Sequence, residues 1–119
     1  MPNVVLQDQD GQNIALKDHL NGKIGVVFFY PMDGSPGCTK EACSFRDSYE
    51  DFQEAGAEVV GISPDSVDSH DQFARNQELP FRILSDEDNV ARDAFGVPGF
   101  LFGLFSGRVT YIFNRESAL

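Results

Sequence analysis

The chain has 119 residues, the usual size of one domain and too short for two, so we expect a single domain over residues 1–119. Hydrophobic residues make up 41% of the chain and phenylalanine alone contributes 11 side chains, which supplies a buried core and excludes a wholly disordered chain. The formal net charge of -10 repels a phosphate backbone, so nucleic acid is excluded as a favoured partner.

Membrane and secretory classes are also disfavoured. No run approaches the roughly 18 apolar residues that a membrane span needs, and residues 1–3 open without the basic-then-apolar pattern of a secretory signal. The two cysteines, Cys38 and Cys43, are too few for the disulfide framework of a small secreted domain. We expect a soluble protein without a membrane partner.

The N-terminal part is predicted to form a β-hairpin and then a buried strand. The hairpin consists of Val4–Leu6 and Ile14–Leu16 on either side of an Asp-Gly turn. Lys23–Tyr30 is a continuous run of β-branched and aromatic residues, as expected for a strand buried on both faces. A loop rich in proline and glycine follows at Pro31–Gly37.

Helices and strands then alternate. From Pro36 to Gly56, apolar or small residues recur at a spacing near 3.6, which predicts one amphipathic helix. These residues are Ala42, Phe45, Tyr49 and Phe52. Ala57–Ser63 is predicted to be a strand and Ser66–Asn76 a second helix. The inward face of the second helix is expected to carry Val67, His70, Phe73 and Ala74.

The remaining elements complete a layered α/β sandwich. Phe81–Leu84 is predicted to be a strand, Asn89–Phe95 a short helix, and Arg108–Phe113 a fourth strand of the central sheet. In such folds helices cover the sheet, and the chemistry lies at the carboxyl ends of the strands. The loop Pro31–Cys38 leaves the most buried strand at that end, so we expect the functional residues there.

Cys38 is predicted to be a nucleophile. Ser35 is placed to cap the following helix and Pro36 suits its first position, which makes Cys38 about its third residue. Its sulfur then lies beside unpaired backbone N–H groups at the positive end of the helix dipole, a setting that favours a thiolate. The alternative is a buried free cysteine that packs as a small hydrophobic residue.

Cys43 follows five residues later. On an intact helix the two Cα atoms are about 8 to 9 Å apart and on different faces, whereas a disulfide needs Cα atoms within about 7 Å. Oxidation to a disulfide therefore requires the first turns to unwind, unlike the C-x-x-C spacing of dithiol exchangers. The alternative for Cys43 is again a packed apolar residue.

The segment Phe28–Asp47 resembles the active-site segment of the peroxiredoxins, specifically the peroxiredoxin Q or bacterioferritin comigratory protein branch. The family pattern Pro-x-x-x-Thr/Ser-x-x-Cys is matched by Pro31, Ser35 and Cys38, and the branch adds a second cysteine at the spacing of Cys43. The resemblance continues over nearly the whole chain, and its later stretches look closest to plastid and cyanobacterial members.

The resemblance implies a thioredoxin-dependent thiol peroxidase with a thioredoxin-like fold, a three-layer sandwich with an N-terminal β-hairpin. Cys38 would be the peroxidatic residue, which a peroxide oxidises to a sulfenic acid, and Cys43 the resolving residue that closes an intramolecular disulfide. Thioredoxin or a similar dithiol donor would reduce that disulfide. The substrates implied are hydrogen peroxide and organic hydroperoxides.

The resemblance also assigns the neighbouring residues. Arg108 is matched to the family's active-site arginine, which stabilises the thiolate and the polarised peroxide. The Ser35 hydroxyl would donate to the peroxide, and Pro31 would shape the loop and shield the site. From the sequence pattern alone, Arg108 is predicted to be a solvated arginine at a strand end, and Pro31 a plain loop proline. Glu41 and Arg46 are weaker candidates for a hydrogen-bond network around the site.

The implied setting is a monomer without cofactor or metal, in the cytoplasm, or in the chloroplast if the source is a plant or alga. Ser35 replaces the commoner threonine but keeps its hydroxyl. The sequence stops at Leu119 where relatives continue, so a C-terminal strand and helix are expected to be lacking.

The alternative function is a non-enzymatic thioredoxin-fold redox switch or binding module. A general dithiol oxidoreductase is disfavoured by the cysteine spacing.

Overall fold

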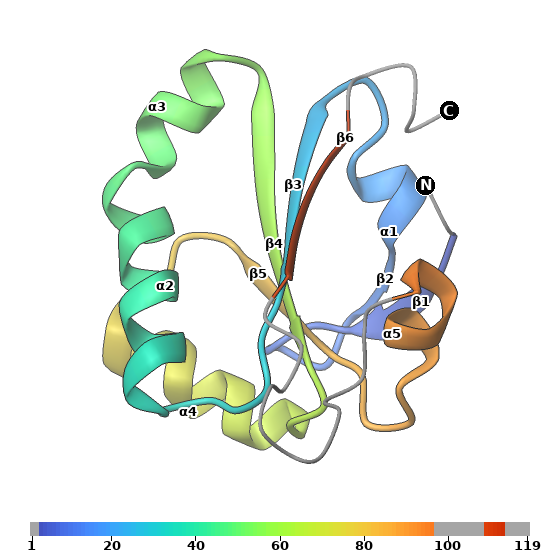
Figure 1. Cartoon of the computed structure of the whole chain (residues 1–119), viewed down its shortest axis with the longest axis vertical. Helices are drawn as coiled ribbons and strands as arrows, with labels where there is room; N and C mark the ends of the chain where they lie inside the picture. Colours follow the sequence, from blue (N-terminus) through green and yellow to red (C-terminus); the bar gives the residue numbers. More distant parts are fainter. Residues whose placement is uncertain (1–2, 97–108, 114–119) are drawn as a thin grey trace.

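The computed structural model describes residues 3–96 and 109–113, and the structural statements below concern these residues (Figure 1). Within them the strands form one mixed sheet in the order β2-β1-β5-β4-β3-β6. The strands are β1 Val5–Gln7, β2 Asn13–Ala15, β3 Ile24–Phe29, β4 Ala57–Ser63, β5 Arg82–Ser85 and β6 Val109–Phe113. Strands β3, β4 and β5 are parallel, whereas β6 is antiparallel to β3 and β1 is antiparallel to β5. The carboxyl ends of the three parallel strands therefore meet at one end of the sheet.

Helices cover both faces of this sheet. They are α1 Leu16–His19, α2 Pro36–Asp47, α3 Tyr49–Glu54, α4 Val67–Gln77 and α5 Val90–Phe95. Figure 1 shows α2, α3 and α4 against one face and α1 and α5 against the other. This is the three-layer α/β sandwich with an N-terminal hairpin that the sequence predicts.

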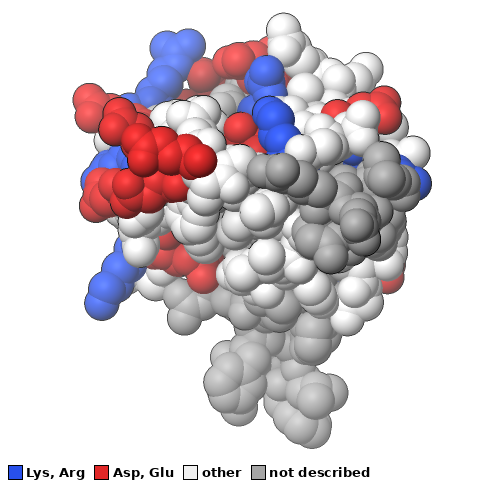
Figure 2. All heavy atoms as spheres, turned by 90° about the horizontal axis from the view of Figure 1, so that it is seen from above, with Lys and Arg blue, Asp and Glu red and all other residues white. Residues whose placement is uncertain are grey.

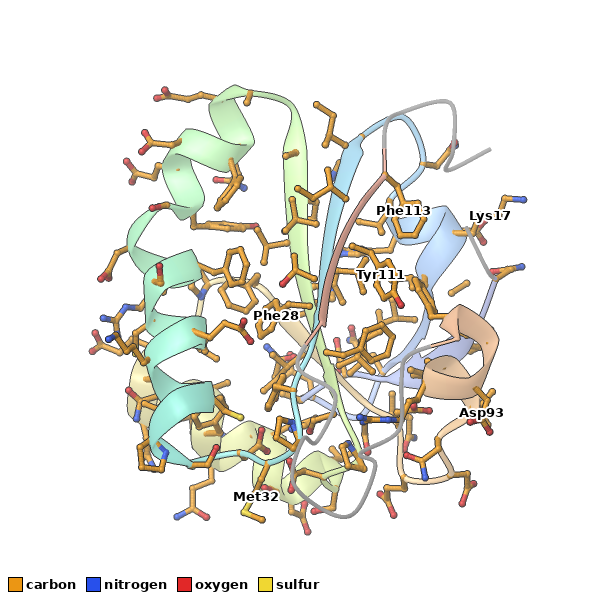
Figure 3. All side chains as sticks on the ribbon, viewed as in Figure 1. Lys17, Phe28, Met32, Asp93, Tyr111 and Phe113 are labelled. Atoms are coloured by element: carbon orange, nitrogen blue, oxygen red, sulfur yellow. The ribbon has the colours of Figure 1, made fainter. Side chains whose placement is uncertain are left out.

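Strand β3 supplies side chains to a hydrophobic cluster on each face of the sheet, because successive residues of a strand point in opposite directions. Phe28 points from β3 toward α2 (Figure 3), where its ring stacks on that of Phe45 with 4.8 Å between centroids. On the other face the ring of Phe29 meets those of Phe95 at 5.1 Å and Tyr111 at 6.0 Å. Burial of each such ring contributes about 1.5 to 3 kcal/mol, so β3 holds the layers together.

Most predicted elements are confirmed within a residue or two, but the single helix predicted from Pro36 to Gly56 is wrong. Ser48 interrupts it with φ -103° and ψ 7°, which separates α2 from α3. Asp47 and Ser48 are weak helix formers, because their short polar side chains compete with the helical backbone bonds. Leu16, predicted to end the hairpin, instead begins α1 and is fully buried in the second cluster.

The predicted inward face of α4 is confirmed for three of its four residues. His70, Phe73 and Ala74 are buried, whereas Val67 is half-buried. The helix begins at an N-cap, Ser66, whose side chain accepts from the backbone N–H of Ser69 at 3.2 Å. This bond satisfies one of the N–H groups of the first turn and so stabilises the start of the helix.

The surface of the described part carries the charge that the composition requires. Figure 2 shows acidic side chains gathered on the side of the molecule where α3 lies, and Glu50 and Asp51 occupy the first turn of that helix. Acidic residues there complement the helix dipole. In the described ranges no helix has the length and apolar character needed to cross a membrane.

Candidate active site

Cys38 lies just beyond the carboxyl end of β3. The strand ends at Phe29, and the loop 30–35 leads into α2, of which Pro36 is the first residue and Cys38 the third. Cys38 is 1% exposed and belongs to the hydrophobic cluster beneath α2. Backbone N–H groups in the first turn of a helix have no partners within the helix and carry a partial positive charge. The predicted position of Cys38 at the amino end of a helix is confirmed.

Ser35 occupies the N-cap position of α2, but its side chain does not cap the helix as expected. The hydroxyl donates instead to the carbonyl oxygen of Met32 at 3.2 Å. The reason is a turn over residues 32–35, in which Gly34 adopts φ 81° and brings that carbonyl within reach of Ser35. The Ser35 side chain therefore leaves the first-turn N–H groups around Cys38 uncapped.

Cys43 lies on the same helix as Cys38 and is half-buried. Its thiol donates to Oε1 of Gln77, the last residue of α4, at 3.3 Å. Both cysteines are free, in agreement with the helix geometry, which keeps residues five apart from forming a disulfide. In the folded helix the Cys43 thiol is thus held by α4.

Asp33 ties the loop before Cys38 to its surroundings. Its Oδ1 accepts from the Tyr30 hydroxyl at 2.6 Å, and its Oδ2 accepts from the Ser69 hydroxyl at 2.8 Å. The same Oδ2 lies 2.6 Å from Nδ1 of His70, and the backbone N–H of Asp33 donates to the Asp65 carboxylate at 2.7 Å. The Asp33 side chain is only 6% exposed, so movement of the loop requires these bonds to break without ready replacement by water.

His70 is fully buried, and both nitrogens of its ring face oxygen atoms. Its Nε2 lies 3.0 Å from the carbonyl oxygen of Leu84; a carbonyl only accepts, so Nε2 carries a hydrogen. The contact between Nδ1 and Asp33 is of hydrogen-bond length. Burial, with the Asp33 charge adding to it, holds the pKa of Tyr30 well above its usual value, which keeps its hydroxyl a donor.

Asp33, Asp65 and His70 also bring three potential metal-ligand atoms within 4.8 Å of one another. Each of these side chains already takes part in hydrogen bonds, including one from the Ser63 hydroxyl to Asp65 at 2.7 Å. Those bonds account for the close approach of the three groups. A metal ion at this place would have to displace them.

The other predicted site residues are distributed as follows. Pro31 is half-buried in the loop after β3, and the described peptide bonds are all trans. Arg108 lies outside the described residues. Arg46 donates from Nη1 to the backbone carbonyl of Gln77 at 2.7 Å, and so contacts the end of α4. Glu41, its proposed companion, is half-buried on α2.

The sequence pattern does not indicate the network around Asp33. Helical periodicity places His70 on the inward face of α4 but indicates no partner for it and no role for Asp33. A signal was present: a buried helix face rarely carries a histidine without a polar partner. Asp33 follows β3 and Asp65 follows β4, so these carboxylates come from the carboxyl ends of adjacent parallel strands.

We expect His70→Ala to lower the free energy of unfolding by about 2 to 4 kcal/mol, because the buried Asp33 carboxylate and the Leu84 carbonyl each lose their contact with the His70 ring. Urea denaturation measures the change. Ser69→Ala removes only one donor to Asp33 and is expected to cost about 1 kcal/mol. Equal midpoints for the two variants would contradict the importance assigned to the His70 bonds.

Comparison with a family model, with curated proteins and with solved structures gives the same family each time. The model of the AhpC/TSA family matches residues 1–119. The chain is 52% identical over 118 residues to the chloroplastic peroxiredoxin Q of Gentiana triflora and 51% identical to that of Arabidopsis thaliana, covering 99% of this chain and 54% of each relative. It therefore spans about half the length of the curated relatives it matches.

Solved structures agree in fold. The peroxidoxin BcpB of Mycobacterium tuberculosis superposes with a TM-score of 0.88 at 36% identity, covering 98% of this chain and 77% of that one. The bacterioferritin comigratory protein of Xanthomonas campestris gives 0.85 at 32% identity, with 96% and 75% covered. The predicted resemblance and the thioredoxin-like α/β fold it implied are both confirmed.

Proposed function

The chain belongs to the AhpC/TSA family, in its peroxiredoxin Q branch, and on this premise we propose that it is a thiol peroxidase acting on hydrogen peroxide and organic hydroperoxides. The observation that carries the proposal is the position of Cys38, a buried thiol in the first turn of α2 beside N–H groups that the Ser35 side chain does not cap. The amino end of a helix favours negative charge, and the thiolate is the attacking form of a cysteine. The Xanthomonas protein is described by its alkyl peroxide reduction activity, which supports organic hydroperoxides as substrates.

In the first step the Cys38 thiolate attacks one oxygen of the peroxide. A sulfur–oxygen bond forms and the oxygen–oxygen bond breaks, which oxidises Cys38 to a sulfenic acid and releases hydroxide or an alkoxide. The leaving oxygen takes a proton and departs as water or an alcohol. Donors that face this oxygen stabilise the transition state most, because the negative charge develops there.

In the second step the Cys43 thiol condenses with the sulfenic acid, forming the Cys38–Cys43 disulfide and releasing water. Because the two residues are five apart on one helix, the start of α2 unwinds for this step. Thioredoxin or a similar dithiol donor then reduces the disulfide by exchange and is itself oxidised. Overall, one peroxide and one dithiol yield one alcohol, or water, together with one water and one disulfide.

The remaining assignments belong to the same proposal. Ser35 offers a hydroxyl and Pro31 shapes the loop, while Arg108 stabilises the thiolate and the polarised peroxide. Residues 1–119 act as one domain and as a monomer, with no cofactor and no metal. The names of the plant relatives favour the chloroplast if the source is a plant or alga, and the cytoplasm otherwise.

Arg108→Ala is expected to slow oxidation of Cys38 by about ten- to a hundredfold, because a charged donor to the developing oxyanion is lost. The measurement is the second-order rate constant for loss of the free Cys38 thiol after mixing with hydrogen peroxide. Arg75→Ala is the control, since the Arg75 side chain is 79% exposed on α4, where it pairs with Asp71 one helical turn away. Equal rates for the two variants would remove Arg108 from the proposed mechanism.

The direct test is the intact mass of the reduced chain after one equivalent of hydrogen peroxide, quenched within seconds. The expected result is the loss of two hydrogens, with the new bond mapped between Cys38 and Cys43. No change in mass over that time would overturn the peroxidase proposal and favour the redox switch or binding module, which needs no rapid cleavage of an oxygen–oxygen bond.

A further inference from the structure

Gln77, at the C-terminal end of α4, contacts α2 through both its side chain and its backbone. The Cys43 thiol donates to the side-chain oxygen Oε1 of Gln77 at 3.3 Å. The Arg46 guanidinium donates to the backbone carbonyl of Gln77 at 2.7 Å. The second contact satisfies a carbonyl left unpaired at the end of a helix and places a cation at the negative end of its dipole. It depends on the backbone of Gln77 and survives any change of its side chain.

The first contact concerns the proposed reaction directly. The sulfur of Cys43 must leave its place against α4 before it reaches Cys38, because the intact helix keeps the two residues too far apart and on different faces. The hydrogen bond to Gln77 is present in the folded helix and is lost when Cys43 moves. It therefore stabilises the starting state of disulfide formation, while the attack of peroxide on Cys38 leaves it untouched.

We propose that Gln77 is a positioning residue that holds the Cys43 thiol in folded α2 and thereby sets the lifetime of the Cys38 sulfenic acid. This inference rests on the proposed peroxidase function. A longer-lived sulfenic acid has two fates: condensation with Cys43, or reaction with a second peroxide to a sulfinic acid. Gln77 thus sets how much peroxide the chain tolerates before Cys38 is over-oxidised.

The test is Gln77→Leu, which removes the acceptor and keeps a side chain of similar size on the half-buried position. The reduced chain is mixed with hydrogen peroxide and quenched over time, and intact mass separates thiol, sulfenic acid, disulfide and sulfinic acid. We expect disulfide formation to become about three- to tenfold faster, the effect of one lost hydrogen bond. The peroxide concentration that gives half sulfinic acid should rise by the same factor. The rate of the first oxidation should stay within about twofold.

Two further variants make the test specific. Gln77→Glu keeps an oxygen acceptor on a side chain of the same length and is expected to keep the slow rate of disulfide formation within about twofold. Gln72→Leu makes the same substitution at an exposed position of α4 and is expected to change neither rate. If Gln77 had a merely structural role, Gln77→Leu would slow both Cys38 oxidation and disulfide formation or lower the stability of the chain. It would not shift the balance between disulfide and sulfinic acid.

The outcomes separate the two proposals. Rapid oxidation of Cys38 with an unchanged rate of disulfide formation in Gln77→Leu would overturn the role of Gln77 and leave the peroxidase function standing. Acceleration in Gln72→Leu equal to that in Gln77→Leu would overturn the role as well. If peroxide oxidises Cys38 in none of the variants, the proposed function itself fails, and the inference fails with it.

Discussion

Replacing Cys38 with serine is expected to abolish peroxide consumption, a loss of at least about a thousandfold. A neutral hydroxyl at this position is a far poorer nucleophile than a thiolate. The groups around it stabilise negative charge that develops during the attack, but they cannot replace the nucleophile. Serine is close in size to cysteine, so the buried position beneath α2 tolerates it. The measurement is the rate of hydrogen peroxide loss with a dithiol donor in excess, together with circular dichroism to establish folding.

The matched control for this variant is Ser44→Ala on the exposed face of the same helix. Its rate is expected to stay within about twofold of the unsubstituted chain, because surface substitutions change little. Peroxide consumption that persists in Cys38→Ser but disappears in Cys43→Ser would reverse the roles assigned to the two thiols. Persistence in both variants would mean that neither cysteine carries the reaction.

Cys43→Ser is expected to keep the first step and lose the second. Each chain should consume one equivalent of hydrogen peroxide, hold a sulfenic acid on Cys38, and pass to a sulfinic acid when more peroxide is added. Turnover supported by thioredoxin should fall at least about tenfold, because no internal disulfide forms for the donor to reduce. Intact mass follows the gain of one and then two oxygen atoms, and an assay of peroxide loss follows turnover.

Cys43→Ser removes the reaction of Cys43 with the sulfenic acid but is not expected to move α2. The serine hydroxyl can donate to Gln77 as the thiol does, so the helix is expected to keep its place against α4. Disulfide formation in Cys43→Ser is impossible within one chain, and undiminished turnover would show that the donor reduces the sulfenic acid directly. The resolving role of Cys43 would then be wrong, although the role of Cys38 would stand.

Helix α4 contacts the chain on both sides of Cys38. Near its amino end, Ser69 and His70 hold Asp33 in the loop before the cysteine. At its carboxyl end, Gln77 contacts the helix after the cysteine. The two supports differ in strength: the first is buried and includes a charged group, whereas the second includes a weak bond from a half-buried thiol. We therefore expect α2 to unwind more readily than the loop 30–35 moves.

Local sequence predicted the elements because their signals are strong and need no distant partner. The apolar run at β3 and the Pro-Gly-Cys at the start of α2 determine a buried strand and a thiol in the first turn of a helix. The five-residue spacing of Cys38 and Cys43 determines that they cannot pair in an intact helix. The interruption at Ser48 was missed, since the apolar spacing continues across it and the polar residues there carry only a weak signal.

The sequence by itself therefore determined the α/β class, the place of Cys38 and the family to which the chain belongs. Only the tertiary structure decided the partners: Asp33 with His70 across 37 positions, and Cys43 with Gln77 across 34. The physical reason is that helical and strand periodicity act over a few residues, whereas hydrogen bonds between elements depend on how α4 packs against the sheet and against α2. That packing gives His70, predicted only to lie on an inward helix face, and Gln77, given no role by the sequence pattern, their contacts with the segment around Cys38.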